Sequence, residues 1–353
     1  MPQPSRPLSG SVWGSLALIA IIIAGTAGAF AYTAGWLSPQ RLTPDKMIAA
    51  LAPPGGPALG HRRNHAKGIC FTGIFEANGN GAALSRAAVL ARGQHRALGR
   101  FNLATPNPEA ADATVRVRGL GLLISSADGQ EWRSALLDAP VFAVSTPQAF
   151  HELLLASASK SPGAMEAFAK ANPEIAAFAT WTKTAPWTAS FAEDRFNSLN
   201  SFIFTDASGA DHAVRWSLLP TAQVMPVQPA DIEKLGPDGL ETEIAARVRD
   251  KGPVRWTMRV TVANAGDPTN DPTKAWPEDR RTIEVGTLVV QQIEAEADGP
   301  CRDVNFDPTV LPPGMRTSDD PFPAARSSVY RESYDRRTAE AKDYPRAATG
   351  AKP

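Results

Sequence analysis

The chain is organised around Arg62-Arg63-Asn64-His65-Ala66-Lys67-Gly68 and a distant second segment, Arg326-Ser327-Ser328-Val329-Tyr330. The first segment places an imidazole beside a cluster of basic side chains. The second places an arginine four residues before a tyrosine, so both side chains lie on one helix face. A tyrosine hydroxyl titrates near ~10, but a neighbouring guanidinium and a bound cation can hold it as a phenolate.

Four further segments occur in a fixed order along the chain. They are Phe202-Ile203-Phe204-Thr205-Asp206-Ala207-Ser208-Gly209 with Val214-Arg215-Trp216, then Asp271-Pro272-Thr273-Lys274-Ala275-Trp276-Pro277, Glu284-Val285-Gly286, and Phe306-Asp307-Pro308-Thr309-Val310-Leu311-Pro312-Pro313-Gly314-Met315. Together the six segments resemble signatures of the catalase core, in the order of that family. The chain ends soon after Tyr330, and in this it resembles the small membrane-anchored catalase-related peroxidases.

The hydrophobic periodicity predicts many strands joined by hairpins, with helices inserted as blocks, which indicates an α+β fold with a mainly antiparallel sheet. The resemblance implies that the strands close into an eight-stranded barrel. Strands are expected at 68–77, 98–103, 113–124, 131–137, 201–205, 212–218, 254–262 and 282–290, and helices at 44–52, 81–92, 147–155 and 230–250.

The resemblance also implies roles for individual residues around haem b. His65 would move the proton of a peroxide above the iron. Tyr330 would be the axial iron ligand, kept deprotonated by Arg326. Guanidinium groups suit the carboxylates of haem propionates. The arginines at matching positions are Arg62, Arg100 and Arg337.

Two further residues are candidates for the side of the haem that faces His65. Phe150 is expected to stack near the imidazole. In Leu137-Asp138-Ala139-Pro140, Asp138 stands where catalases carry an asparagine. A carboxylate there can donate to peroxide only when protonated, which predicts pH-dependent activity.

Composition limits the classes of partner. The chain has 36 basic and 36 acidic residues, which gives no electrostatic basis for nucleic-acid binding. Its two cysteines, Cys70 and Cys301, lack the spacing of a zinc site. Two buried thiols, or one disulfide formed in an oxidising compartment, both remain open.

The N-terminal region is long and apolar. No charged residue lies between Arg6 and Arg41, and the stretch from 12 to 37 is long enough to cross a bilayer. Aromatic residues at both ends and Arg6 before the stretch favour a membrane anchor with the body exported. A cleaved signal peptide with a site near 27–29, or a buried core helix, are the alternatives.

These observations predict a short cytoplasmic tail (1–11), the anchor or signal (12–37), a haem domain (38–340) and a disordered tail (341–353). The expected function is a haem peroxidase that reduces hydrogen peroxide or organic hydroperoxides with a small organic reductant, as a monomer or homodimer on the exported side. Two other functions stay open. One is a true catalase that dismutates hydrogen peroxide, and the other is a non-catalytic haem-binding or sensor protein.

Overall fold

The computed structural model describes residues 10–38 and 41–343, and the chain separates into two compact units, residues 1–43 and 44–353. The first unit contains helix α1 (Gly10–Thr33), and its segment Val12–Thr33 is long and apolar enough to cross a membrane. Its two threonine hydroxyls, on Thr26 and Thr33, donate to carbonyls one turn earlier. The helix therefore keeps these polar groups satisfied without solvent.

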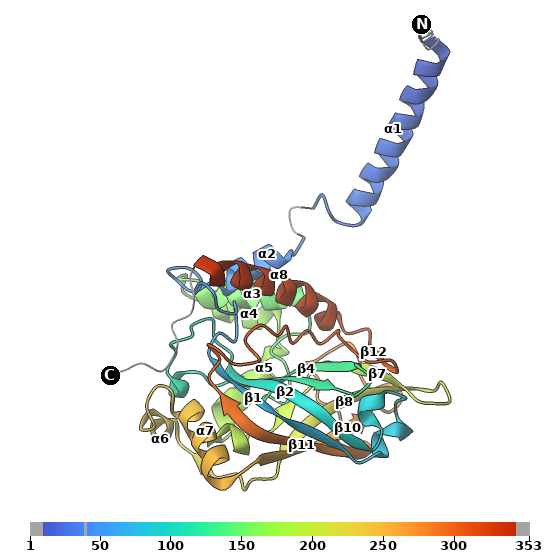
Figure 1. Cartoon of the computed structure of the whole chain (residues 1–353). Helices are drawn as coiled ribbons and strands as arrows, with labels where there is room; N and C mark the ends of the chain where they lie inside the picture. The colour runs from blue at the N-terminus through green and yellow to red at the C-terminus, as the bar shows by residue number, and fades with distance from the viewer. Residues whose placement is uncertain (1–9, 39–40, 344–353) are drawn as a thin grey trace, which may run out of the picture. The chain divides into compact units, whose positions relative to one another are not determined.

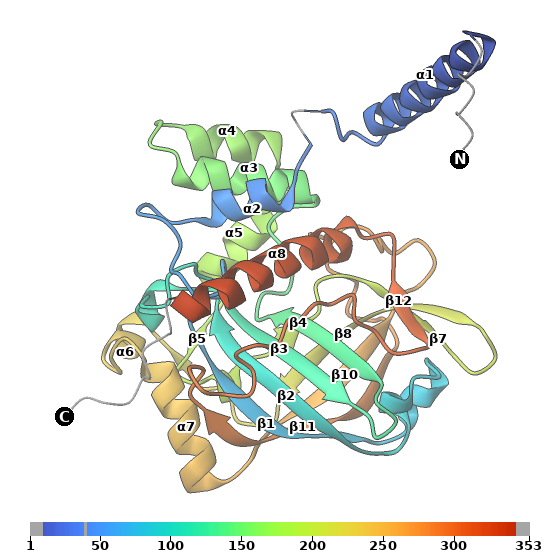
Figure 2. The same ribbon diagram turned by 45° about the horizontal axis from the view of Figure 1, so that its top comes forward.

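The second unit is built on an antiparallel β-barrel of eight strands, in the order β10-β11-β1-β2-β3-β4-β6-β8 and closed by pairing of β8 with β10. Figures 1 and 2 show the curved strands of this barrel. The predicted barrel is confirmed. Its strands are β1 (Gly68–Ala77), β2 (Gly93–Leu103), β3 (Arg118–Ser125), β4 (Glu131–Leu137), β6 (Phe196–Asn197), β8 (Asp211–Pro220), β10 (Val254–Val262) and β11 (Thr282–Glu294).

Four short strands lie outside this ring. β7 (Phe202–Thr205) forms the predicted hairpin with β8, and β12 (Met315–Thr317) pairs with β7. β5 (Trp187–Thr188) and β9 (Pro226–Val227) form a separate pair.

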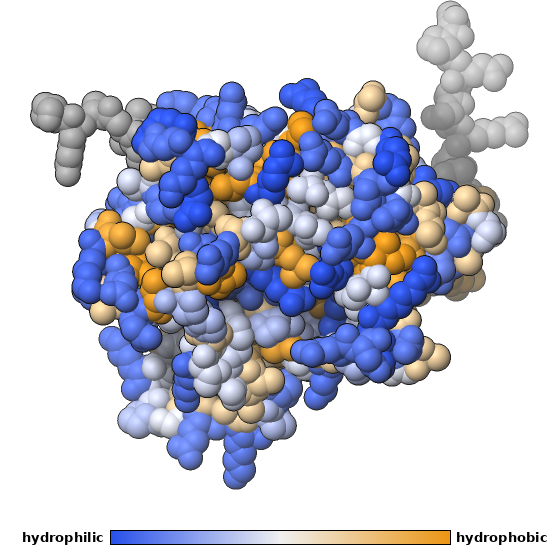
Figure 3. Space-filling model, turned by 90° about the horizontal axis from the view of Figure 1, so that it is seen from below, coloured by the Kyte–Doolittle hydropathy of each residue, from blue (hydrophilic) through white to orange (hydrophobic). Residues whose placement is uncertain are grey.

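The barrel is filled with large side chains. Trp132 and Trp216 are buried, with ring centroids 5.0 Å apart, and Phe101 stacks on Phe191 at 5.2 Å. Burial alternates along β4, as expected for a strand with one face on the core. The outer face seen in Figure 3 is mainly hydrophilic, with apolar residues in small separate groups.

One group of helices covers one side of the barrel (Figures 1 and 2). These helices are α2 (Pro44–Leu51), α3 (Pro147–Ala158), α4 (Ala164–Ala171), α5 (Ile175–Thr184) and α8 (Pro321–Asp343). As predicted, α3 begins at Pro147, and the hydroxyl of Thr146 accepts a hydrogen bond from Ala149 N at 3.1 Å. A second hydrophobic core joins α3 and α4 to Phe322 of α8.

Two predicted helices differ from the structure. The segment 81–92 forms only short 3-10 turns, η1 (Asn80–Ala83) and η2 (Ala88–Leu90). Its polar groups bond to distant strands instead, since Arg86 N donates to Thr205 O and Ser85 Oγ donates to Gly314 O.

The single helix predicted at 230–250 is two helices, α6 (Pro229–Glu233) and α7 (Gly239–Lys251). Gly236 between them has φ 88, and Pro237 follows it, so the backbone leaves the helical conformation there. The predicted strand at 113–124 begins only at Arg118, after the 3-10 turn η3 (Asp112–Thr114). α8 continues through 341–343, whereas 1–9 and 344–353 lie outside the described residues.

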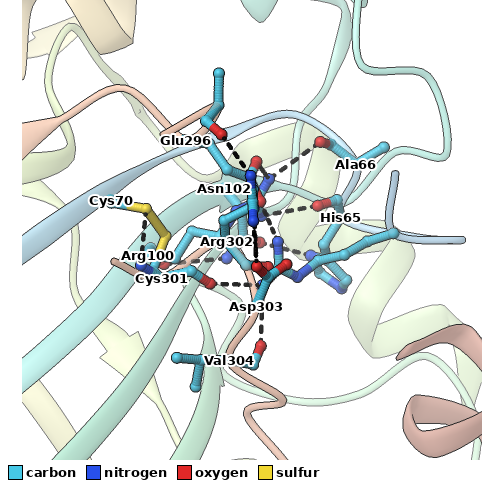
Figure 4. The surroundings of a disulfide bond; sticks show 12 residues. His65, Ala66, Cys70, Arg100, Asn102, Glu296, Cys301, Arg302, Asp303 and Val304 are labelled. Atoms are coloured by element: carbon cyan, nitrogen blue, oxygen red, sulfur yellow. Dashed lines mark hydrogen bonds and ion pairs between the residues drawn. A yellow bond between two sulfur atoms is a disulfide. The ribbon is translucent and has the colours of Figure 1, made fainter. Parts of the chain in front are cut away.

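The two cysteines form a disulfide. Cys70 of β1 and Cys301, in the loop after β11, are joined with their Cα atoms 5.4 Å apart, and both side chains are fully buried (Figure 4). Of the two states that the sequence left open, the disulfide is therefore the observed one.

Candidate active site

His65 lies in the loop before β1, in an unusual backbone conformation. Its φ is 54, the only positive value for a non-glycine residue within 10–38 and 41–343. Its N–H donates to Asn64 Oδ1 at 2.9 Å, and its carbonyl accepts from Arg100 Nη1 at 2.8 Å. Such backbone conformations persist only where surrounding contacts hold them, and they concentrate at functional sites.

The imidazole of His65 is oriented by Asn102, whose Oδ1 lies 2.6 Å from His65 Nδ1. Asn102 Nδ2 donates to the carbonyl of Arg100 at 3.2 Å, which turns Oδ1 towards the imidazole. In this assignment Nδ1 carries the proton and Nε2 is the acceptor. Asn102 was not predicted from the sequence. The only available signal was its position on β2, two residues after Arg100 and on the same face.

Burial of the ring lowers the pKa of His65 from 6.5 to about 4. The hydrogen bond to Asn102 acts in the opposite direction, whereas the positive charges of Arg100, Arg326 and Arg62 lower the pKa further. The ring is thus a neutral base at pH 7. It also lies within electrostatic reach of arginines from both predicted segments.

The loop that carries His65 is fastened to helix α8. Arg63 N donates to Ser333 Oγ at 3.1 Å, and the Arg63 guanidinium forms an ion pair with Glu340. Gly60 N donates to the same carboxylate at 2.8 Å. The His65 loop and helix α8 are therefore directly bonded, although Arg63 and Ser333 are 270 residues apart in sequence.

Tyr330 and Arg326 form the contact that their spacing predicted. Arg326 Nη2 donates to the Tyr330 hydroxyl oxygen at 2.9 Å and to Ala135 O at 3.2 Å. Arg326 Nη1 donates to Asn200 Oδ1 at 2.8 Å, and Asn200 is in turn bonded to Asp320. The Arg326 guanidinium is therefore fixed beside the tyrosine oxygen. Asn200, like Asn102, was not predicted.

The three arginines expected to bind propionates lie around one loop. Arg62 and Arg337 both donate to Val304 O, at 3.1 and 3.3 Å. Arg62 and Arg100 both form ion pairs with Glu296. Figure 4 shows Glu296, Arg100, Asn102 and His65 beside the disulfide.

Asp138 follows β4 and is held by two neighbours. Its Oδ1 accepts from Arg118 N at 2.9 Å, and its Oδ2 from Arg116 Nη1 at 3.0 Å. The Arg116 guanidinium in turn lies 4.0 Å from the centre of the Trp181 ring. Burial, and secondarily the charge of Asp194, raises the pKa of Asp138 to about 7, so the carboxyl changes protonation near neutral pH.

Phe150 lies in the second hydrophobic core. Its ring is 5.3 Å from that of Phe142, which packs edge-on against Phe322 at 5.0 Å. The described ring contacts thus join Phe150 to the covering helices, and its predicted place near His65 stays a prediction.

The chain as a whole is similar to known proteins. A family model described as "Catalase" matches residues 57–344. The chain belongs to the catalase family. Two catalase-related peroxidases are similar over almost their whole length. That of Synechococcus elongatus is 31% identical over 326 residues, covering 91% of this chain and 96% of the relative, and that of Mycolicibacterium paratuberculosis is 33% identical over 300 residues, covering 84% and 95%.

Solved catalases share the fold. A bacterial catalase superimposes with a TM-score of 0.71 at 18% identity, over 84% of this chain and 61% of the catalase. A fungal catalase gives a TM-score of 0.70 at 18% identity, over 79% and 60%. The chain therefore spans about 60% of the length of these catalases. Proteins of the catalase family typically bind haem, and the predicted family membership is confirmed.

Proposed function

We propose that this protein is a haem b peroxidase that reduces hydrogen peroxide or organic hydroperoxides with electrons from a small organic reductant. The main support for this proposal is that the His65 loop is hydrogen-bonded directly to α8, the helix that contains Arg326 and Tyr330. Both relatives are named catalase-related peroxidases, and more than nine tenths of each aligns with this chain. Their names support a peroxidase reaction over other reactions of haem proteins.

The side chains suit haem b. Tyr330 offers an oxygen ligand supported by Arg326. Arg100 and Arg337 are 1% and 3% exposed, and Arg62 lies beside them, whereas Glu296 is the carboxylate that Arg62 and Arg100 share. Asp303 pairs with Arg337 at 3.8 Å, so three guanidinium groups face two carboxylates, and the remaining positive charge fits a haem propionate. When bound, haem supplies an iron centre that can be oxidised and reduced again.

The chain itself would manage the protons. His65 Nε2 accepts the proton of the peroxide, and the imidazolium returns it to the second oxygen, so that water or an alcohol leaves. Over the cycle a hydroperoxide, two electrons and two protons give an alcohol and water. Asn102 keeps Nε2 available by bonding to Nδ1.

Two further roles belong to this proposal. Asp138 would act on the peroxide side as a carboxyl whose protonation changes near pH 7, which makes activity pH-dependent. Phe150 would form part of the aromatic wall on that side. Neither role is required for the proton transfer by His65.

The proposal includes a location. We infer that α1 anchors the protein and that the body lies on the exported side. The disulfide supports this, because such bonds persist in oxidising compartments. Carbonate extraction of membranes distinguishes an anchor from a cleaved signal, and labelling of the body with an impermeant reagent tests its side. We expect a monomer or homodimer, which light scattering measures.

The deciding experiment compares oxygen release from hydrogen peroxide with oxidation of an artificial reductant by the haem-loaded protein and by His65→Ala. We expect reductant oxidation with little oxygen release, reduced by about 10²–10⁴-fold in the variant because its acid–base group is lost. His212→Ala is the matched control, since His212 is also a partly buried, hydrogen-bonded histidine but bonds to Asp206 in the β7–β8 hairpin. Vigorous oxygen release would identify a catalase. Bound haem with no turnover in either protein would indicate a carrier or sensor.

A further inference from the structure

Glu296 connects two of the buried arginines. Its Oε2 lies 2.6 Å from Arg100 Nη2, and its Oε1 forms an ion pair with Arg62. The Glu296 side chain is 11% exposed, and those of Arg100 and Arg62 are 1% and 13% exposed. Buried ion pairs of this kind fix the orientation of both partners, and removing one partner leaves an uncompensated buried charge.

The chain around Glu296 is held on both sides. Glu296 lies two residues beyond the end of β11, which pairs with β1 through Glu294 and Cys70. On the other side, the disulfide joins Cys301 to Cys70, and Cys301 N also donates to Cys70 Sγ at 3.3 Å. The Cys301 carbonyl accepts from Arg62 at 3.1 Å. The loop with Glu296 is therefore attached to the same strand before and after it, and Figure 4 shows the second attachment, the disulfide, together with Glu296.

Arg100 connects Glu296 to the backbone of His65 and Ala66. Its Nη1 donates to the carbonyl of His65 at 2.8 Å, and its Nη2 donates to that of Ala66 at 3.0 Å. Room for the guanidinium depends on Gly68, because a Cβ on that residue would lie 2.7 Å from Arg100 Cζ. The Glu296 carboxylate thus orients a guanidinium that holds two consecutive carbonyls, and the first belongs to the residue with the left-handed backbone.

We propose that Glu296 is a positioning residue for His65. Its carboxylate, kept in place by the Cys70–Cys301 disulfide, orients Arg100, and Arg100 fixes the backbone from which the imidazole projects. Arg100 is then a support of the histidine loop, in addition to any contact with haem carboxylates. The inference deepens the proposed function and rests on it only for the kinetic measurement.

The first test is hydrogen–deuterium exchange of the full-length protein as purified, read at a peptide covering 60–68. Glu296→Ala is expected to speed exchange there on the order of 10-fold, because loss of the carboxylate releases Arg100 and the loop. Glu284→Ala is the matched control. Glu284 lies on β11 and forms one ion pair with Arg259, but at 56% side-chain exposure, so its loss leaves exchange at 60–68 unchanged.

Two more variants separate the parts of the inference. Glu296→Gln keeps one acceptor oxygen but loses the charge, so it is expected to fall between wild type and Glu296→Ala. The double variant Cys70→Ser with Cys301→Ser keeps Glu296 but frees its loop. It is expected to speed exchange at 60–68 less than Glu296→Ala does, because the ion pairs remain.

The kinetic measurement distinguishes positioning from general stability. In the haem-loaded protein, Glu296→Ala is expected to lower kcat/KM for hydrogen peroxide by about 10- to 100-fold, as a small misplacement of a catalytic group does. The KM for the reductant should not change. If haem-loaded wild type consumes no peroxide, the proposed function fails, and the exchange data still decide the role of Glu296. Wild-type exchange at 60–68 in Glu296→Ala, or in the folded Glu296→Gln if the first variant does not fold, overturns the inference.

Discussion

The two halves of the site, one around His65 and one around Tyr330, are held in different ways. His65 lies in a loop, and its position depends on Asn102 and Arg100, which β2 supplies, and on Glu296 beyond β11. Tyr330 lies within a 23-residue helix, and its arginine partner is one turn away on the same helix. The histidine side therefore depends on several distant contacts, and the tyrosine side on one regular element. Single substitutions should affect the two sides differently.

The largest effect is expected on the helix side, at the proposed iron ligand. Tyr330→Phe removes the ligand oxygen without changing the shape of the ring, and leaves α8 intact. We expect activity to fall by more than about 100-fold, because even indirect partners of a metal ligand are worth 10- to 100-fold. Haem content by absorption, together with turnover, measures this. Tyr334→Phe serves as control, since that ring packs against Arg337 on the same helix. Unchanged haem binding and turnover in Tyr330→Phe would remove the tyrosine from the ligand role.

An intermediate effect is expected on the loop side, at Asn102. Asn102→Ala removes the acceptor for His65 Nδ1, and kcat/KM for peroxide should fall by about 10- to 100-fold, a part of what general acid–base catalysis supplies. The Asn102 hydrogen bond raises the pKa of His65, so its loss should move the acid limb of the pH profile below about 4.

Asn102→Asp gives the opposite shift and sharpens the test. A carboxylate beside the imidazole favours the charged ring, so the acid limb should move upwards from about 4. The pH dependence of kcat/KM in the three proteins measures both shifts. Identical profiles would mean that Asn102 does not orient the reacting histidine.

The smallest effect is expected at Asp138, where the measurement is stability rather than turnover. Burial raises the pKa of its carboxyl from 3.8 to about 7, so the folded protein favours the neutral form. The neutral carboxyl therefore contributes to the free energy of unfolding. This contribution is complete below pH 3.8 and is lost as the pH rises through about 7. Asp138→Asn should therefore gain stability relative to wild type over that range, on the order of 1–3 kcal/mol.

Urea unfolding at several pH values measures this gain. A difference between Asp138→Asn and wild type that stays constant with pH would show that the carboxyl has the same pKa in the folded and unfolded protein. Loss of the pH dependence of turnover in the same variant would assign Asp138 to the His65 side of the comparison.

The contrast between the helix that carries Tyr330 and the loop that carries His65 also explains which contacts could be predicted from the sequence. The Arg326–Tyr330 contact follows from helical spacing alone, and the ordered segments led to the barrel through family resemblance. Asn102, Asn200 and Glu296 were missed because each acts on a partner far away in sequence, where no local spacing exists. The disulfide was undetermined for the same reason, since its cysteines are 231 residues apart.

The helices predicted at 81–92 and 230–250 differ from the structure because the hydrophobic pattern was not the strongest local influence. At 81–92 the apolar spacing is helical, but Ser85 and Arg86 bond to other segments. Between α6 and α7, Gly236 and Pro237 outweigh the amphipathic pattern on both sides. In both places a competing backbone preference or a tertiary contact decided the outcome.

The attachment of the His65 loop to α8 also sets an order for biogenesis. α8 follows every barrel strand in the chain, so ribosomes make Tyr330, Arg326 and the Arg63 partner Glu340 after the whole sheet has been synthesised. A nascent chain that carries all the strands still lacks the groups proposed to hold iron. The proposed haem could thus gain its tyrosine ligand only after synthesis of α8, and a chain interrupted before α8 would carry the His65 half of the site without that ligand.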